Sequence, residues 1–152
     1  MGKGLEETVD ILQELHREVD GIAWAPYLKQ YPTGEIARSD MPCVMTIPQT
    51  GVWGVRQLGL GCVADDRVYR VVVITADTGT GIETEYFSEP CRLIDEFGRL
   101  YNSKSIATAG GGDLTIRLDG ELPLDTGLDD EIVHADTRYY GFQFTIRIWR
   151  KL

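Results

Sequence analysis

The sequence contains little cysteine, and its cysteines follow no metal-binding or redox spacing. Only three of the 152 residues are cysteines, Cys43, Cys62 and Cys91, with no CxxC pair and no Cys/His cluster. An odd number in apolar surroundings argues against a disulfide framework and against a cysteine-based zinc site. We expect small buried hydrophobic residues in a protein made in a reducing cytoplasm.

Long apolar runs are also missing. No stretch approaches the roughly 20 apolar residues that cross a bilayer, and the N-terminal segment has the pattern of a charged amphipathic helix, unlike a signal peptide. The composition does not change along the chain. We therefore predict a single domain over residues 1–152, with its own hydrophobic core and no membrane partner.

Cations are scarce relative to anions. The chain has 15 Lys and Arg against 24 Asp and Glu, which gives a formal net charge of -9 and a pI near 4.6. A surface of this charge repels phosphate backbones, so tight wrapping of nucleic acid is excluded. The charge is compatible with a protein past which DNA slides without specific binding.

Only two histidines are present, which restricts the catalytic sets that can be assembled. Neither His16 nor His134 combines with Ser, Asp or Cys into a hydrolytic triad, and we interpret both as structural or surface residues. The pairs Gly59-Leu-Gly61 and Gly79-Thr-Gly81 lack the remaining residues of a phosphate loop. We predict no catalytic residues and no cofactor.

One pattern supports an enzymatic alternative. Residues 71–80 resemble the apolar-apolar-Asp-Thr-Gly-Thr signature of aspartic proteases around Asp77, and Asp125-Thr-Gly127 repeats the tripeptide. Two carboxylates that share one proton could activate water. However, Leu128 stands where that signature has a small residue, and Asp-Thr-Gly is also an ordinary turn sequence. An aspartic-type hydrolase using Asp77 remains the alternative.

Regular alternation of apolar residues is abundant near the C-terminus. Between Arg138 and Trp149, alternate positions are apolar, which predicts a long strand laid across a core. The opposite face of that strand mixes polar and aromatic residues. The apolar face comprises Tyr140, Phe142, Phe144, Ile146 and Ile148, and the mixed face Tyr139, Gln143, Thr145, Arg147 and Trp149.

The other patterns predict two helices and several strands. Apolar stripes at three-four spacing predict helices from Leu5 to about Asp20 and from Pro90 to Tyr101, with Pro90 in the first turn of the second. Strands are predicted at 41–48, 52–63, 67–76 and 113–119, with a turn at residues 64–66. The predicted fold class is α+β, a mainly antiparallel sheet packed against two helices in a single domain.

Residues 120–137 combine six acids with no Lys or Arg. We predict a long polar loop, and loops of this length in compact domains are usually functional or mobile. Several carboxylates could hold a hard cation, but the spacing does not match an EF-hand. A solvated or partner-facing surface is therefore preferred to a metal site.

The order of these elements resembles that of the tail terminator, or tail completion, proteins of long-tailed bacteriophages. The resemblance covers most of the chain. It begins with an amphipathic N-terminal helix and continues with the strand 41–48 bracketed by prolines, the hairpin into 67–76 and the helix 90–101. It ends in a closing strand of the Tyr-x-Gly-x-x-Phe type, here Tyr139-Tyr-Gly-Phe-Gln-Phe-Thr-Ile.

The resemblance implies a structural virion protein without catalysis. Proteins of that family form a ring of six that caps the tail tube, ends its polymerisation and binds the head-completion protein, leaving a channel for DNA. It implies a homohexamer at the tail-neck junction of the virion, assembled in the host cytoplasm. Its partners would be the tail tube protein and the head-completion or neck protein.

Within this interpretation, the acidic segment and three aromatic residues are candidate interface or channel positions. Besides the aspartic-type hydrolase, two alternatives remain open, which are another head-tail connector or neck protein (a stopper or adaptor) and a host-encoded binding domain. The candidate positions are Asp125, Asp129, Asp130, Glu131, Asp136, Trp53, Tyr139 and Trp149.

Overall fold

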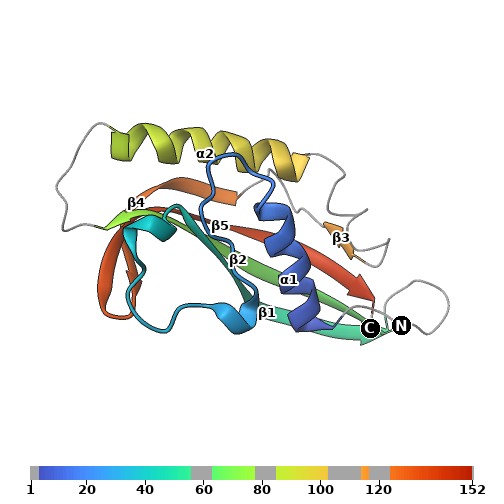
Figure 1. Cartoon of the computed structure of the whole chain (residues 1–152). Coiled ribbons are helices and arrows are strands. Elements are labelled where there is room, and N and C mark those ends of the chain that lie inside the picture. Colours follow the sequence, from blue (N-terminus) through green and yellow to red (C-terminus); the bar gives the residue numbers. More distant parts are fainter. Residues whose placement is uncertain (1–3, 56–62, 78–84, 103–113, 117–123, 152) are drawn as a thin grey trace.

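The computed structural model describes residues 4–55, 63–77, 85–102, 114–116 and 124–151 (Figure 1). Among these residues, two α-helices and five β-strands form one α+β domain, as the sequence predicted. The helices are α1 (Leu5–His16) and α2 (Glu85–Asn102). The strands are β1 (Cys43–Val55), β2 (Val63–Asp77), β3 (Leu114–Ile116), β4 (Leu124–His134) and β5 (Thr137–Lys151).

The C-terminal strand β5 is the centre of the sheet. It pairs with β2 along one edge and with both β3 and β4 along the other, while β1 pairs with the far side of β2. Every pairing between these strands is antiparallel. The apolar alternation of residues 138–149 therefore marks a strand with neighbours on both sides.

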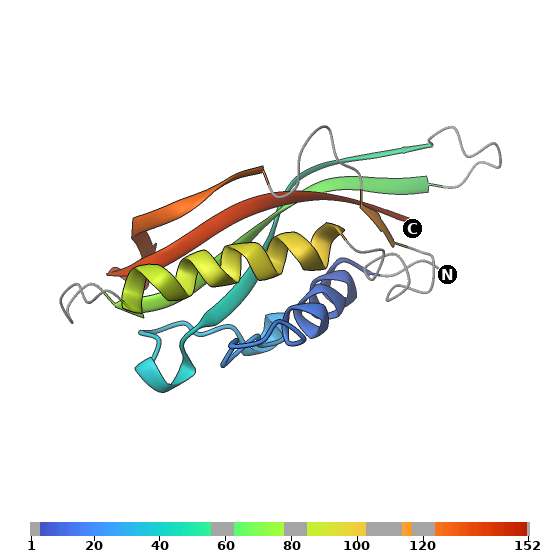
Figure 2. The same ribbon diagram turned by 90° about the horizontal axis from the view of Figure 1, so that it is seen from above.

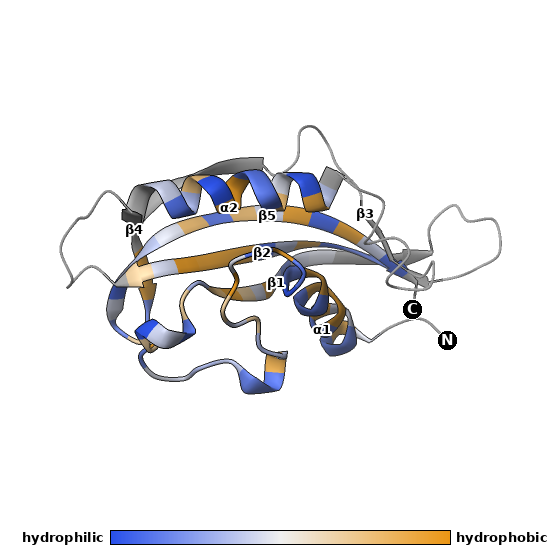
Figure 3. Ribbon diagram, turned by 45° about the horizontal axis from the view of Figure 1, so that its top comes forward, coloured by the Kyte–Doolittle hydropathy of each residue, from blue (hydrophilic) through white to orange (hydrophobic). Residues whose placement is uncertain are grey.

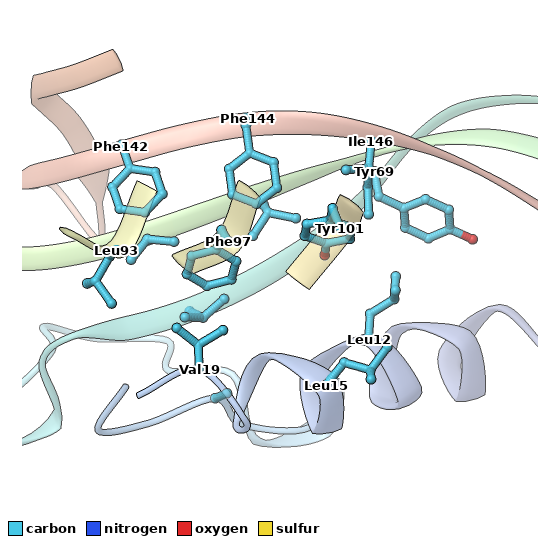
Figure 4. Close-up of a cluster of buried hydrophobic side chains, with 14 of the residues drawn as sticks. Leu12, Leu15, Val19, Tyr69, Leu93, Phe97, Tyr101, Phe142, Phe144 and Ile146 are labelled. Atoms are coloured by element: carbon cyan, nitrogen blue, oxygen red, sulfur yellow. The ribbon is translucent and has the colours of Figure 1, made fainter. Parts of the chain in front are cut away.

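Both helices cover the same face of the sheet (Figure 2). Each turns its apolar stripe towards the strands and its charged side outwards, as Figure 3 shows for α2. Aromatic rings from β5 meet those of α2, with Phe97 5.5 Å from Phe144 and 5.9 Å from Phe142 between centroids (Figure 4). Burial of these side chains is the main driving force that holds the helices on the sheet.

Two predicted helix boundaries were wrong. Helix α1 ends at His16, before Asp20, although Val19 remains buried in the core. Helix α2 begins at Glu85, so Pro90 lies inside it and not in its first turn. Leu93 and Phe97 are fully buried in the core, and their packing outweighs the hydrogen bond that proline cannot donate.

The predicted β1–β2 turn at residues 64–66 was also wrong. Strand β2 already includes these residues, and Asp65 pairs with Trp53 across the hairpin. The connection falls at residues 56–62, outside the described part of the chain. Antiparallel pairing over this length outweighed the local turn preference of Ala64-Asp65-Asp66.

The predicted acidic loop 120–137 is largely a strand. Residues Leu124–His134 form β4, which pairs with β5 through two register shifts. A two-residue turn follows, with Ala135 and Asp136 at φ of 50° and 63°. Both values belong to the left-handed region that a type I′ hairpin turn requires. Pairing with a strongly strand-forming neighbour thus overrode the acidic composition of β4.

The turn end of the β4–β5 hairpin bends away from the helices (Figure 1). There Tyr139 accepts a hydrogen bond from the backbone N–H of Ile36 at 3.0 Å, and Thr137 donates one to Glu35 at 3.1 Å. A second apolar cluster fills the bend on the face without helices. It comprises Ile36, Cys43, Met45, Val72, Ile74, Ile132 and Tyr139.

Candidate interface on the helix-free face

The face of the sheet opposite α1 and α2 carries an open cleft of about 270 Å³. We call this surface the helix-free face. Strands β1, β2 and β5 form the floor of the cleft, and the bent end of β4 forms one wall, which explains why no local sequence pattern indicated it. The residues that line it are Met45, Ile47, Arg70, Val72, Ile74, Ile132, Val133, His134 and Gln143.

The cleft combines apolar side chains on its floor with an exposed guanidinium. Arg70 is exposed and lies opposite Ile47 on β1 and Thr145 on β5. The Nε2 atom of His134 is buried and has no hydrogen-bond partner within the described structure. Val133, at the rim, is 63% exposed and is the large hydrophobic residue that the described part of the chain leaves exposed. Such a surface has the chemistry of a contact with another protein.

Most predicted interface residues lie on strands, and the structure does not gather them into one site. Asp125, Asp129, Asp130 and Glu131 belong to β4, at the edge of the sheet, and Trp53 belongs to β1 near the opposite edge. These five residues therefore lie in strands separated by β2 and β5.

Three further predicted residues have different surroundings. Asp136 is exposed in the β4–β5 turn. Trp149 is half-buried on β5, where it pairs with Asp66 of β2 and Thr115 of β3. Tyr139 is only 1% exposed, and its hydroxyl binds Ile36, so its side chain is part of the second cluster and is not available as a surface aromatic.

The two Asp-Thr-Gly sequences cannot form a carboxylate pair within one chain. Asp77 pairs with Tyr139, whereas Leu124, which precedes Asp125, pairs with Thr145 on the other side of β5. The two partner positions on β5, Tyr139 and Thr145, are 145 − 139 = 6 residues apart, which corresponds to about 20 Å along the strand. Two carboxyl groups that share a proton lie about 3 Å apart. The register thus separates the residues on which the aspartic-type alternative depended.

His16 belongs to a buried polar network. The Gln13 amide donates to the carbonyl oxygens of Pro26 at 2.8 Å and Val44 at 2.7 Å. Its oxygen therefore acts as acceptor, for the Thr46 hydroxyl at 2.8 Å and for Nδ1–H of His16 at 3.0 Å.

The second ring nitrogen of His16 completes the network. With the proton on Nδ1, Nε2 accepts a hydrogen bond from the Tyr101 hydroxyl. Burial lowers the pKa of His16 to about 3 and raises that of Tyr101. Both groups are neutral at pH 7, so the network joins α1, β1 and α2 without a buried charge. The structural interpretation of His16 fits these contacts.

Ion pairs gather near the C-terminal end of β5. Asp65 is fully buried and accepts from Arg150 at 2.8 Å and from Arg67 at 3.1 Å. On the opposite face, Asp66 accepts from Arg147 at 3.0 Å. The pairs of Arg150 and Arg147 join β5 to β2 and hold the two central strands together, whereas the pair of Arg67 lies within β2.

No cluster of three or more His, Cys, Asp or Glu side chains suited to a metal ion occurs within the ranges that the structure describes. In the same ranges, no helix is long and apolar enough to cross a membrane.

Comparison with known proteins does not assign the chain to a family. No family model matches it, and no curated protein shows significant sequence similarity to it.

Proposed function

We propose that this chain is a structural component of the neck of a long-tailed bacteriophage, most specifically a tail terminator. In this role, copies of the chain form a ring on the end of the tail tube, stop its polymerisation and bind the head-completion protein. The ring leaves a channel through which DNA passes. The resemblance in the order of elements is the starting point of this proposal.

The observation that carries the proposal is the helix-free face. This face exposes Val133 and the guanidinium of Arg70 at an open cleft, and a ring subunit needs surfaces of this kind for its neighbours. Neither α1 nor α2 covers this face, because both pack on the other side of the sheet.

The charge balance supports the same role. A net charge of -9 disfavours adhesion of DNA to the protein, which suits a channel that the polymer must traverse quickly. The proposal requires no catalytic residue and no cofactor, and it locates the protein at the tail-neck junction of the virion.

The experiment is a capping assay with the tail tube protein encoded by the same genome. Purified chain is added to polymerising tube protein, and tube lengths are measured by negative-stain electron microscopy. A terminator gives shorter tubes with density at one end. Unchanged lengths and no bound density would refute the terminator role, and capture of only portal or head-completion proteins from lysing source cells would favour a stopper or adaptor.

A further inference from the structure

Arg70 differs from Arg67 on the same strand and from Arg147 and Arg150 on the neighbouring strand β5. Arg67 and Arg150 bind Asp65, and Arg147 binds Asp66. Arg70, in contrast, forms no ion pair within the described structure, although it lies on the same strand as both aspartates. Its guanidinium is thus a cation available to a ligand at the helix-free face.

The surroundings of Arg70 favour a carboxylate attached to an apolar group. The cleft offers the exposed guanidinium beside a floor that includes Val72 and Met45. A guanidinium pairs best with a carboxylate, and the pair is stronger where apolar walls exclude water. At about 270 Å³ the open cleft is below the usual size of a small-molecule site and suits side chains of a protein.

This chain itself contains a segment of complementary chemistry. Asp129, Asp130 and Glu131 follow one another in β4 with Leu128 and Ile132 on either side, and no Lys or Arg occurs between residues 120 and 137. The segment directly precedes the residues of β4 that line the cleft. In a protein of net charge -9, an unpaired arginine is a favourable place for such a segment from another copy.

We propose that Arg70 of one copy binds a carboxylate from residues 129–131 of a second copy, and that the cleft and Val133 become buried in this contact. The inference rests on the proposed function, because it names the surface through which copies in the ring meet. It assigns to the acidic segment a positive partner in another copy of the chain, so that self-association needs no other kind of molecule.

The test is a charge exchange followed by sedimentation of the full chain at several concentrations. Arg70→Glu should weaken self-association at least tenfold, and so should the triple reversal of Asp129, Asp130 and Glu131 to Lys. The combination of both should restore association, since the attraction is restored with its signs exchanged. Raising the salt concentration should weaken the wild-type contact through screening.

Two further variants keep the test decisive. Lys29→Glu makes the same change in charge at an 82% exposed position outside the cleft and should leave association unchanged. If the triple reversal does not fold, as judged by circular dichroism, Val133→Glu replaces it and should also weaken association. A chain that stays monomeric at all concentrations, or associates equally well with Arg70→Glu, would overturn the inference.

The capping assay separates this inference from the proposed function. Association that depends on Arg70 but produces no capped tubes would retain the inference and remove the terminator role. If the chain caps tubes but neither charge reversal changes its self-association, the terminator role is retained and the inference is overturned. Loss of tube binding alone in Arg70→Glu would show that the cleft serves the tube protein, which also overturns the inference.

Discussion

The backbone of Gly141 on β5 lies directly against the carbonyl oxygen of Val73 on β2. A Cβ at position 141 would enter the space of that oxygen and would also approach the Val73 carbonyl carbon to 3.0 Å. The register between β2 and β5 shifts in the same region, between Ile74 and Ala76. Glycine is therefore required at this position of the Tyr-x-Gly segment, because two strands approach each other closely at the bend.

Gly141→Ala should destabilise the fold by about 3 kcal/mol, the upper end of the usual range for overpacking. The obstacle is backbone and cannot rotate away. Urea unfolding of the variant measures the effect. Gly98→Ala is the matched control, since a Cβ there meets nothing within 4 Å in α2 and should stabilise by about 0.5–1 kcal/mol. Equal effects of the two substitutions would contradict the packing argument.

His16 should make the fold sensitive to mild acid. Burial lowers its pKa to about 3 from an unfolded value of 6.5, so between these values the unfolded chain binds a proton that the folded chain does not. Its contribution to stability is fully present above pH 6.5 and decreases as pH falls towards 3, by at most about 1.4 kcal/mol per pH unit.

Urea unfolding at pH 7 and pH 5 checks this expectation. His16→Gln should lower stability at pH 7, because Gln13 and Tyr101 lose a partner. The same variant should also show a smaller loss between the two pH values than the wild type. A variant with the wild-type loss would show that other groups cause the acid sensitivity.

Ala135→Asn should stabilise the β4–β5 hairpin by about 1 kcal/mol. Ala135 has a φ of 50°, a conformation that costs an alanine roughly 1–2 kcal/mol and that asparagine tolerates. Thermal unfolding of the variant measures the gain. Ala23→Asn, at an exposed position that has no positive φ and caps no helix, is the control and should bring no increase. A gain at both positions would point to an effect on the unfolded chain.

Asp65→Ala should cost about 3 kcal/mol or more, because it removes a buried carboxylate that pairs with the buried guanidinium of Arg150. The double variant Asp65→Ala/Arg150→Met should recover much of that loss, because it also removes the buried charge that the carboxylate balanced. Urea unfolding compares both with Glu96→Ala, which removes an exposed ion pair to Arg99 and should change stability by less than about 1 kcal/mol. A double variant as unstable as the single one would refute the charge explanation.

The strongest periodic patterns predicted the central strand and both helices. The alternation in residues 138–149 predicted β5, and the stripes containing Leu12 and Phe97 predicted the two helices. These patterns could be recognised because one face of each element is buried against the same core. The predictions were wrong where tertiary packing or pairing outweighed local preference, as at Ala64–Asp66, at Pro90 and in the acidic stretch that forms β4.

The candidate surface was less predictable than the fold. The sequence indicated the acidic segment and Trp149, but the cleft depends on how the end of the β4–β5 hairpin bends over Met45 and Val72. No pattern within a single segment of the sequence predicts that bend. Tyr139 illustrates the difficulty, since its alternation with apolar residues suggested a surface aromatic, whereas the bend buries it against Ile36.

The sequence by itself determined the α+β class, the position of the main core and the acidic charge, since each follows from local periodicity or composition. Only the tertiary structure decided which residues face one another across strands. Register placed Asp77 and Asp125 on opposite sides of β5, committed Arg67, Arg147 and Arg150 to aspartates, and left Arg70 in the cleft. Pairing between distant segments is a property of the whole chain, because each strand's register is fixed by the neighbours and turns that join it to the sheet.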